Sequence, residues 1–265
     1  MATPPPPSLD KKRHVRYWLR CLKTCLPEDY IPTDLNRMTL GCFCVSALDL
    51  LGELPFLTSP EDRQGWVEWV YRNQLPDGAP GGGGGFRGSP ATDFGDELRT
   101  ASNQKWDPPN LPGSFFAVAT LVGLGDDLAR VKRKELLALL PALQRADGSF
   151  GESIMYETEP GRGDDAGGAV AAAVAVGSTD MRFVYMAAAL RWMLRGQHGN
   201  GCPDVPDFDV QRTVQYIKSS QSYDSGVSEK PFGESHGMCA LGGAAVRGPS
   251  CLRRRKGDRW LIRLL

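Results

Sequence analysis

The sequence lacks an excess of charge of either sign, and it lacks a long hydrophobic run. Its 265 residues contain 31 Lys and Arg and 31 Asp and Glu, so the formal net charge is zero. Without excess charge there is no global field that would attract nucleic acid, and we expect no nucleic-acid partner. The first residues contain no apolar stretch that could act as a signal peptide, and the run AGGAVAAAVAVG is too short and too weakly hydrophobic to span a bilayer. We therefore expect a soluble, cytoplasmic protein.

Cysteine is present, but its spacing does not indicate a disulfide framework. The seven cysteines follow no regular spacing, and their number is odd. Such a set is typical of a chain that keeps its thiols reduced, as proteins outside the secretory route do. We expect free thiols rather than a fold held by disulfides.

A convincing series of β-strands is also lacking, and the apolar periodicity predicts helices instead. Residues 36–54 are apolar on almost every side, which predicts a buried helix. A further helix is expected after Ser59, which can cap it, with Pro60 in the first turn. Asp180 and Asp207 are the expected caps of two later helices. The full set of expected helices covers residues 10–25, 36–54, 59–74, 111–124, 132–145, 180–195 and 209–221, so the predicted fold class is all-α.

Three glycine-rich turns share the spacing Gln-x-x-Asp directly after a predicted helix. They are NQLPDG with Gln74, LQRADG with Gln144 and SSQSYDSG with Gln221. A glycine near each aspartate can adopt positive φ and end the helix. Repeated helical hairpins bury their faces only against neighbours, so they stack or close into a ring. The alternative is a chance recurrence of a common helix-stop composition.

Two low-complexity segments interrupt this pattern. The run GAPGGGGG at 78–85 lacks the Gly-Lys-Ser/Thr ending of a phosphate-binding loop. The stretch at 161–179 is rich in Gly and Ala. Both are expected to be inserted loops, and the first is expected to be flexible.

The stretch SYDSGVSEKPFGESHGMCALGG, residues 222–243, gathers side chains that carry chemistry. His236 and Cys239 stand at i, i+3 and would share one face of a helix. With Asp224 they could form a three-ligand zinc site. Alternatively, Cys239 is a small core residue and His236 contacts something other than a metal. The spacing alone does not choose between these interpretations.

From about residue 10 to residue 246, the chain resembles the β subunits of the protein prenyltransferases. The stretches that carry the resemblance, in family order, are RHVRYWLRCLKTCLPEDY, NRMTLGCFCVSALDLL, EWVY, GFRGS, GLGDDLARV, LQRADGSF, DMRFVY and YIKSSQSYDSGV followed by ESHG. DMRFVY and ESHG are specific when they occur together. The resemblance is strongest to protein geranylgeranyltransferase type I.

This resemblance implies an α/α barrel, a toroid of inner and outer helices, that pairs with a helical α subunit and uses one zinc ion. The implied reaction transfers a geranylgeranyl group from geranylgeranyl diphosphate to the cysteine of a C-terminal CaaX motif, in proteins such as small GTPases. The β subunits of farnesyltransferase and of Rab geranylgeranyltransferase are alternatives of the same class. A terpene cyclase-like α/α barrel and a non-catalytic helical binding module are alternatives from other classes.

The resemblance also implies which residues face the polar end of the substrate. His236 and Gly237 match positions that contact the diphosphate, and Arg182 with Phe183 matches positions that face the substrates. A diphosphate leaving group needs cations and N–H donors, which these residues can supply. For Arg182 the alternative is a salt bridge in the region of Asp180.

The wall of a pocket for a long isoprenoid must be apolar and aromatic. Phe183, Tyr185 and Trp192, in RFVYMAAALRWML, offer such side chains. By resemblance, Thr39 and Phe43 line the isoprenoid or peptide pocket, where a threonine leaves room for a twenty-carbon chain. The alternative for Thr39 and Phe43 is an ordinary core position.

The residues that the family uses to bind zinc are missing from the sequence. The resemblance implies an Asp-x-Cys pair and a later histidine, whereas this sequence has no Asp-x-Cys and no histidine after His236. We therefore expect no zinc site, no prenyl transfer by this chain as written, and an open, incomplete barrel. Asn110 stands where relatives suggest a histidine, so contacts to the peptide substrate are left open there.

The expected organisation has three parts. Residues 1–9 form a disordered proline-rich tail, and residues 10–246 form a partial prenyltransferase domain. Residues 247–265 end in PSCLRRRKGDRWLIRLL, which resembles nothing in the family. We interpret this end as a gene-model artefact, from a shifted reading frame or a read-through intron. The alternative is a basic amphipathic patch for acidic lipid.

Overall fold

The computed structural model describes residues 9–77, 83–100, 103–158, 170–196 and 201–237. Each of the seven predicted helical segments contains a helix, so these predictions are confirmed. The α-helices are α1 (Lys11–Lys23), α2 (Arg37–Leu50), α3 (Leu54–Leu57), α4 (Pro60–Arg72), α5 (Gly95–Leu98), α6 (Leu111–Leu124), α7 (Arg133–Leu143), α8 (Met181–Arg195) and α9 (Val210–Ser219), and the 3-10 turns are η1 (Glu28–Asn36), η2 (Pro90–Thr92) and η3 (Gln104–Trp106).

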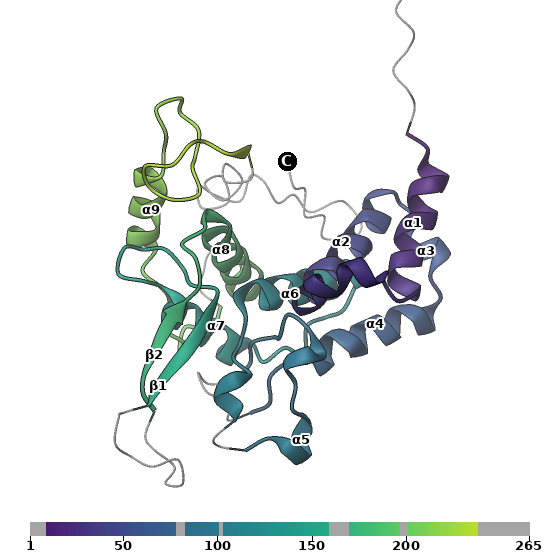
Figure 1. The fold of residues 1–265 in the computed structure, drawn as a ribbon, viewed down its shortest axis with the longest axis horizontal. Helices are drawn as coiled ribbons and strands as arrows, with labels where there is room; N and C mark the ends of the chain where they lie inside the picture. Colours follow the sequence, from purple (N-terminus) through teal and green to yellow (C-terminus); the bar gives the residue numbers. More distant parts are fainter. Residues whose placement is uncertain (1–8, 78–82, 101–102, 159–169, 197–200, 238–265) are drawn as a thin grey trace, which may run out of the picture.

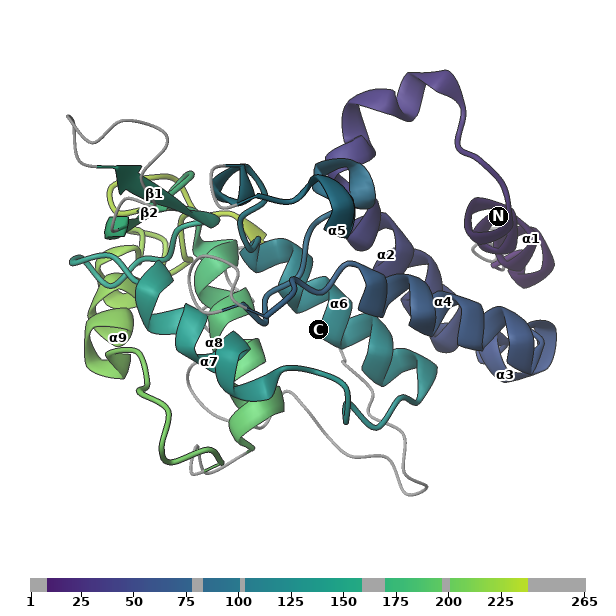
Figure 2. The same cartoon turned by 90° about the horizontal axis from the view of Figure 1, so that it is seen from below.

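The longer helices are arranged in two rows. Helix α6 packs against α2 on one side and α8 on the other, and these three form the inner row. Helix α1 packs on α2, α4 on α6, and α7 on α8, and these form the outer row. In Figures 1 and 2 the helices follow one another along an arc, with α1 at one end and α9 at the other. This layered arc is the open arrangement predicted for repeated helical hairpins.

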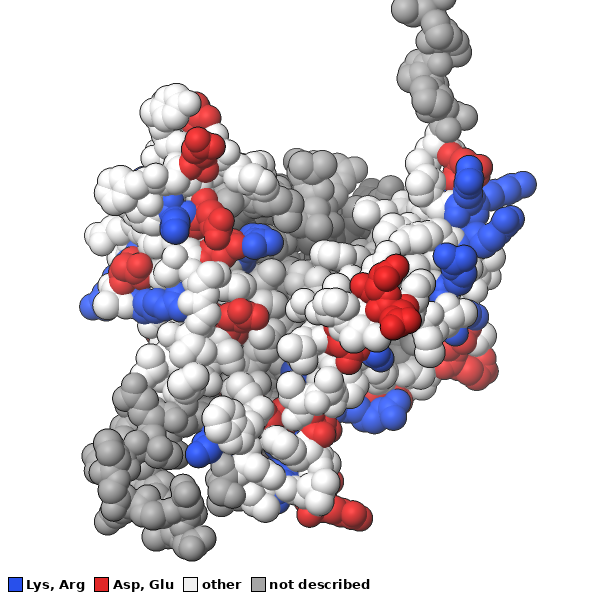
Figure 3. All heavy atoms as spheres, in the orientation of Figure 1, with Lys and Arg blue, Asp and Glu red and all other residues white. Residues whose placement is uncertain are grey.

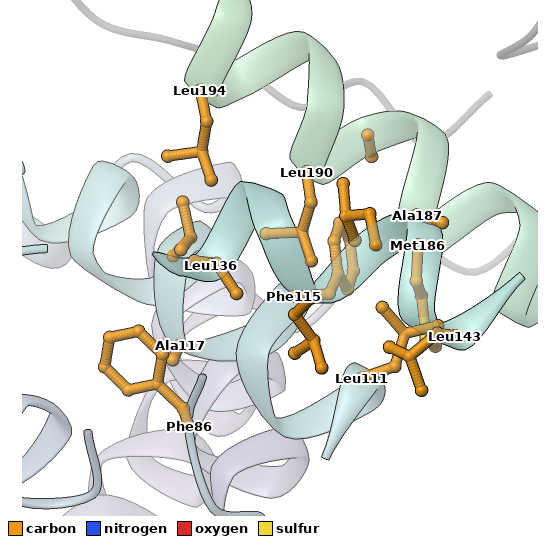
Figure 4. Packing of buried hydrophobic residues seen from close by; sticks show 14 of the residues in the cluster. Phe86, Leu111, Phe115, Ala117, Leu136, Leu143, Met186, Ala187, Leu190 and Leu194 are labelled. Carbon is orange, nitrogen blue, oxygen red and sulfur yellow. The ribbon is translucent and has the colours of Figure 1, made fainter. Parts of the chain in front are cut away.

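The hydrophobic core lies between the two rows. Helix α6 is buried on almost every side because its sequence, LPGSFFAVATLVGL, contains no charged residue. The side chains of Phe115, Leu136 and Leu190 come from α6, α7 and α8, and they gather in one cluster (Figure 4). Each fully buried side chain of this kind stabilises the fold by about 1.5–3 kcal/mol. Packing of the rows therefore positions the inner helices relative to one another.

One of the two predicted aspartate caps is wrong. Ser59 and Asp180 accept hydrogen bonds from backbone N–H groups in the first turns of α4 and α8, as predicted. The cap of α9 is Asp209 rather than Asp207, because the helix begins at Val210. Asp207 pairs instead with Arg191 of α8, at 2.7 Å, and so joins α8 to the loop before α9.

The prediction that residues 36–54 form a buried helix is also wrong in part. Helix α2 buries Met38, Val45 and Leu48 against its neighbours. Phe43 remains 49% exposed and Leu50 67% exposed. The helix belongs to the inner row, so one of its faces is left uncovered by the outer row.

A two-stranded antiparallel sheet replaces part of the predicted inserted loop at 161–179. Strand β1 (Ser153–Thr158) pairs with β2 (Val170–Val176), with Ser153 opposite Val176. Three of the seven residues of β2 are valines, and such β-branched residues favour extended backbone. The expectation that the chain has no strands is therefore corrected, although the described residues remain mainly helical.

The described part of the glycine run at 78–85 is packed rather than flexible. Gly83, Gly84 and Gly85 are buried. A Cβ atom on Gly84 would lie 2.4 Å from the Cβ of Glu135, and its φ is +80°. Glycine is required there because the loop lies directly against α7. The segment at 78–82 lies outside the described residues.

Among the described residues, five cysteines are free thiols, as predicted: Cys21, Cys25, Cys42, Cys44 and Cys202. No helix in this part of the chain has the length and apolar character needed to cross a membrane. Cys239 and the whole segment at 247–265 lie outside the described residues, so the interpretation of that segment stays a prediction.

Candidate active site

An aromatic row crosses the three inner helices. The ring of Phe43 on α2 meets Phe116 on α6 edge to face, with centroids 5.5 Å apart. Phe116 contacts Phe115 at 5.0 Å, and Phe115 contacts Tyr185 on α8 at 5.4 Å, again edge to face. Edge-to-face pairs are a favoured aromatic geometry. The structure thus connects two predicted residues, Phe43 and Tyr185, through two that the sequence analysis missed.

Thr39 and Phe183 differ in their relation to this aromatic row. Thr39 is half-buried and lies one turn before Phe43 on α2, so the two side chains share a face of the helix. Phe183 is buried among the hydrophobic core residues. The role of Phe183 at the substrate stays a prediction.

The first turn of α8 carries a buried carboxylate with a half-exposed guanidinium. Asp180 is 2% exposed, and its Oδ1 accepts a hydrogen bond from the backbone N–H of Arg182 at 2.8 Å. The Nε of Arg182 donates to the other oxygen of Asp180 at 2.7 Å. The salt bridge foreseen as the alternative for Arg182 is therefore present. The side chain of Arg182 is still 56% exposed, so its outer face is accessible.

The segment at 222–237 lies against this end of α8. The backbone N–H of Met181 donates to the carbonyl of Glu229 at 3.0 Å. Within the segment, the backbone N–H of His236 donates to the carbonyl of Val227, also at 3.0 Å. His236 and Gly237 are both exposed. The motifs DMRFVY and ESHG, distant in sequence, are thereby joined by main-chain hydrogen bonds.

Asp224 acts as an organiser of this segment. One carboxylate oxygen accepts from the hydroxyl of Ser222 at 2.6 Å and from the N–H of Gly226 at 3.0 Å, and the other accepts from the hydroxyl of Ser235. These donors stabilise the charged form and lower the pKa of Asp224 to about 2. Its oxygens are thus occupied in shaping the loop.

The described residues do not fit the zinc site that the family resemblance implies. Among them, no group of three His, Cys, Asp or Glu side chains is placed to hold a metal ion. The alternative trio of Asp224, His236 and Cys239 cannot be compared as a set, because Cys239 lies outside the described residues. Asp224 itself is already engaged by two hydroxyls and a backbone N–H.

Cys44, on α2, is not prepared to act as a nucleophile. Burial raises the pKa of its thiol to about 12, and the neighbouring Cys21 adds to the shift. Burial also raises the pKa of Cys42. Since the thiolate is the reactive form, these buried thiols are structural.

Asn110, where the family resemblance suggests histidine, has a structural role. Its side-chain oxygen accepts from the N–H of Gly113 at 2.7 Å and caps α6. Its amide nitrogen lies 3.3 Å from the carboxylate of Glu152, as a donor. Asn110 therefore fixes the start of the central inner helix.

The sequence analysis also missed a buried ionic cluster near this end of α6. Arg87, 2% exposed, donates two hydrogen bonds to Asp107 at 2.7 and 2.6 Å. Arg99 contacts the same carboxylate at 2.8 Å. The sequence gives little indication of this cluster, because Arg87, Arg99 and Asp107 lie in a segment without helical or strand periodicity.

Comparisons with known proteins agree with this geometry. The family described as "Prenyltransferase alpha-alpha toroid domain" matches residues 9–263. The geranylgeranyl transferase type-1 subunit beta of Arabidopsis thaliana is 30% identical over 92% of this chain, and that of Dictyostelium discoideum is 25% identical over 91%. The chain spans 58% and 64% of the length of these relatives, respectively.

A farnesyltransferase and a solved structure are also similar. The protein farnesyltransferase subunit beta of Pyricularia oryzae is 26% identical over 91% of the chain, which spans 40% of that relative. The structure "Candida albicans protein geranylgeranyltransferase-I complexed with GGPP" superposes with a TM-score of 0.72 at 22% identity, over 92% of this chain and 61% of the other. The predicted toroid fold is confirmed by this likeness, and the predicted resemblance to geranylgeranyltransferase type I by the named relatives. The chain belongs to the prenyltransferase family of α/α toroid proteins.

Proposed function

We propose that this chain supplies the prenyl diphosphate-binding part of a geranylgeranyltransferase type I β subunit. The complete reaction would transfer a geranylgeranyl group from its diphosphate to the cysteine of a C-terminal CaaX motif. The proposal is supported by the two type-1 β-subunit relatives and, above all, by the aromatic row on the inner helices.

The aromatic row suits an isoprenoid. Its members come from α2, α6 and α8, so the row crosses the inner wall rather than following a single helix. Phe43 and Phe116 are not fully covered by protein, which leaves ring surface for a ligand. A branched hydrocarbon chain binds by burying apolar surface against such rings.

The diphosphate would lie at the first turn of α8. Arg182 offers a guanidinium that Asp180 holds in place, and His236 and Gly237 lie on the segment that is hydrogen-bonded to this turn. A guanidinium can donate two parallel hydrogen bonds to phosphate oxygens. Thr39, one turn from Phe43, would define the far limit of the pocket and admit the twenty-carbon chain.

The remaining components are proposed from the family. We infer a cytoplasmic heterodimer with a prenyltransferase α subunit, acting on CaaX proteins such as small GTPases. Exposed apolar side chains on η1, namely Ile31 at 65% and Leu35 at 60%, offer surface for such a partner. The described residues do not fit a zinc site. The proposed role of this chain is therefore to bind and orient the diphosphate through the side chains of the aromatic row and the first turn of α8.

The first experiment tests the aromatic row by measuring binding of geranylgeranyl diphosphate by titration calorimetry. Phe116→Ala should weaken binding by about tenfold or more, because it removes an aromatic wall. Phe56→Ala is the matched control, since Phe56 on α3 is 80% exposed and outside the row. Equal affinities for the Phe116 and Phe56 variants would contradict the proposal.

The second experiment separates the diphosphate end from the lipid wall. Arg182→Ala should cost about 1.5–3 kcal/mol of binding to geranylgeranyl diphosphate, as expected for a hydrogen bond to a charged group. The same variant should bind geranylgeraniol, which carries no phosphate, as the unmodified chain does. An equal loss for both ligands would assign Arg182 a structural role through Asp180.

The third experiment tests the preference for the length of the isoprenoid chain, which distinguishes a geranylgeranyltransferase from a farnesyltransferase. Thr39→Trp should exclude the twenty-carbon diphosphate and retain the fifteen-carbon one. The measurement is the ratio of the two affinities by competition. An unchanged ratio of affinities would show that Thr39 does not line the isoprenoid pocket.

A further inference from the structure

Helix α1 concentrates positive charge in a protein whose total charge is balanced. Its sequence, KKRHVRYWLRCLK, contains six Lys and Arg residues and no acidic residue. All six are exposed. Figure 3 shows Lys and Arg side chains gathered over α1, at the edge of the molecule. A local field therefore exists where the global field is absent.

The basic residues share one side of the helix. Successive residues turn by about 100°, so Lys12, Arg13, Arg16, Arg20 and Lys23 fall within an arc of about 100°. A separate, adjoining arc of the helix carries the apolar residues that pack against α2 and its neighbours: Val15, Trp18, Leu19 and Leu22. The apolar face is therefore already used by the fold, and the basic face is directed outward.

The basic residues at the two ends of helix α1 are neutralised, and those in its middle are not. Lys11 pairs with Glu53 and Lys23 with Asp62, each at 2.6 Å. Within the described part of the chain, the side chains of the four middle residues form no ion pair: Lys12, Arg13, Arg16 and Arg20. We call these four the basic face of α1.

We propose that the basic face of α1 binds the surface of an anionic phospholipid bilayer. From Lys12 to Arg20 the helix advances about 12 Å, and α1 lies at the edge of the molecule in both views (Figures 1 and 2). Such a surface can lie against a plane of phosphates. The half-exposed ring of Tyr17, which borders the face, suits the headgroup layer.

The binding is electrostatic and peripheral. Because Val15 and Leu19 are held in the protein, α1 cannot insert an apolar face in the manner of an amphipathic anchor. Exposed cations that form no ion pair with the described residues favour a charge-matched surface over one fixed sequence, which selects the bilayer over an acidic peptide. This inference does not depend on the proposed function.

The test is co-sedimentation of the full chain with vesicles. One set contains phosphatidylcholine alone, and the other contains phosphatidylcholine with about one-third phosphatidylserine. Binding should occur to the anionic vesicles alone and should be lost as salt rises from about 0.1 M to about 1 M, where the screening length falls from about 10 Å to about 3 Å. Equal binding to both vesicles, no binding to either, or insensitivity to salt overturns the proposal.

A matched pair of variants locates the surface. Arg16→Gln with Arg20→Gln should weaken vesicle binding by about tenfold or more. Arg133→Gln with Lys218→Gln removes the same charge from exposed positions on α7 and α9 and should change binding little. Both variants keep the six Lys and Arg residues at 253–263, so these cannot account for a difference.

Two outcomes of the variant experiment would refute the assignment. One is an equal loss in both double variants, with unchanged circular dichroism. The other is that the chain binds soluble poly-glutamate more tightly than anionic vesicles, and that the double variant of Arg16 and Arg20 loses affinity for poly-glutamate alone. The partner of the basic face would then be an acidic polypeptide.

Discussion

The side chain of Gln144 makes a two-point contact with the main chain of Asp209, the cap of α9. Its Nε2 donates to the carbonyl of Asp209 and its Oε1 accepts from the N–H of Asp209, both at 2.8 Å. Gln74 makes the corresponding contact at the start of α7, where Oε1 accepts from the N–H of Lys132 at 3.0 Å and Nε2 donates to the carbonyl of Arg130 at 3.2 Å. Each glutamine thus joins its turn to the start of a later helix, α7 for Gln74 and α9 for Gln144. The first two Gln-x-x-Asp turns are therefore structural equivalents, which supports the predicted repeat.

Loss of this contact should destabilise the fold measurably. Gln144→Ala removes three hydrogen bonds, the two with Asp209 and one to the hydroxyl of Thr213 at 2.9 Å, and should lower the free energy of unfolding by about 1–3 kcal/mol. Urea denaturation measures the change. Gln221→Ala is the control from the third turn, where the side chain makes no hydrogen bond to another described residue, and it should change stability by less than about 0.5 kcal/mol. Equal losses would mean that the contact contributes nothing specific.

Gly148, in the second of these turns, is required by both conformation and space. Its φ is +89°, and a Cβ atom there would lie 2.3 Å from the carbonyl oxygen of Arg212. Gly148→Ala should therefore cost about 2–5 kcal/mol, from backbone strain and overpacking. Gly125 has φ +83° and open space around it, so Gly125→Ala should cost about 1–2 kcal/mol. Thermal unfolding of both variants tests this order, and a reversed order would contradict the predicted clash with α9.

The buried ionic cluster should be sensitive to loss of its carboxylate. Asp107→Asn removes the carboxylate that Arg87 and Arg99 share, leaves Arg87 paired with Asp93 alone, and should cost about 3 kcal/mol. Asp204→Asn is the surface control, because the pair of Asp204 with Lys134 is more than half exposed. It should cost about 0–1 kcal/mol. Denaturant titration distinguishes the two, and a small effect at Asp107 would show that the cluster is readily solvated.

Asp224 should give an acid-sensitive loop. Its pKa, about 2 in the folded protein, is lowered from 3.8, so its contribution to stability is present above pH 4 and is lost as the pH falls toward 2. Titration of the carboxyl carbon by NMR measures this value directly. Ser235→Ala removes one donor and should raise the pKa toward its ordinary value. An unshifted Asp224 in the unmodified protein would contradict the described hydrogen bonds.

Local features of this protein followed from the sequence alone. Helix α6 was predicted with its observed bounds, and the caps Ser59 and Asp180 were recognised, because capping and periodicity depend on residues within four positions of one another. The family and its toroid were also predicted, from motifs spread over most of the chain. Of the three turns, Gly148 has the predicted positive φ, whereas Ser225 takes that conformation in the third.

Tertiary packing decided the composition of the candidate site. Phe115 and Phe116 read as ordinary core residues in an apolar helix, and only the placement of α2 and α8 on either side of α6 makes them links between Phe43 and Tyr185. The same holds for Asp107, whose two arginine partners have no fixed spacing in the sequence. Such contacts depend on where whole helices pack, and packing is set by the burial of many side chains at once, so no short stretch of sequence contains the information.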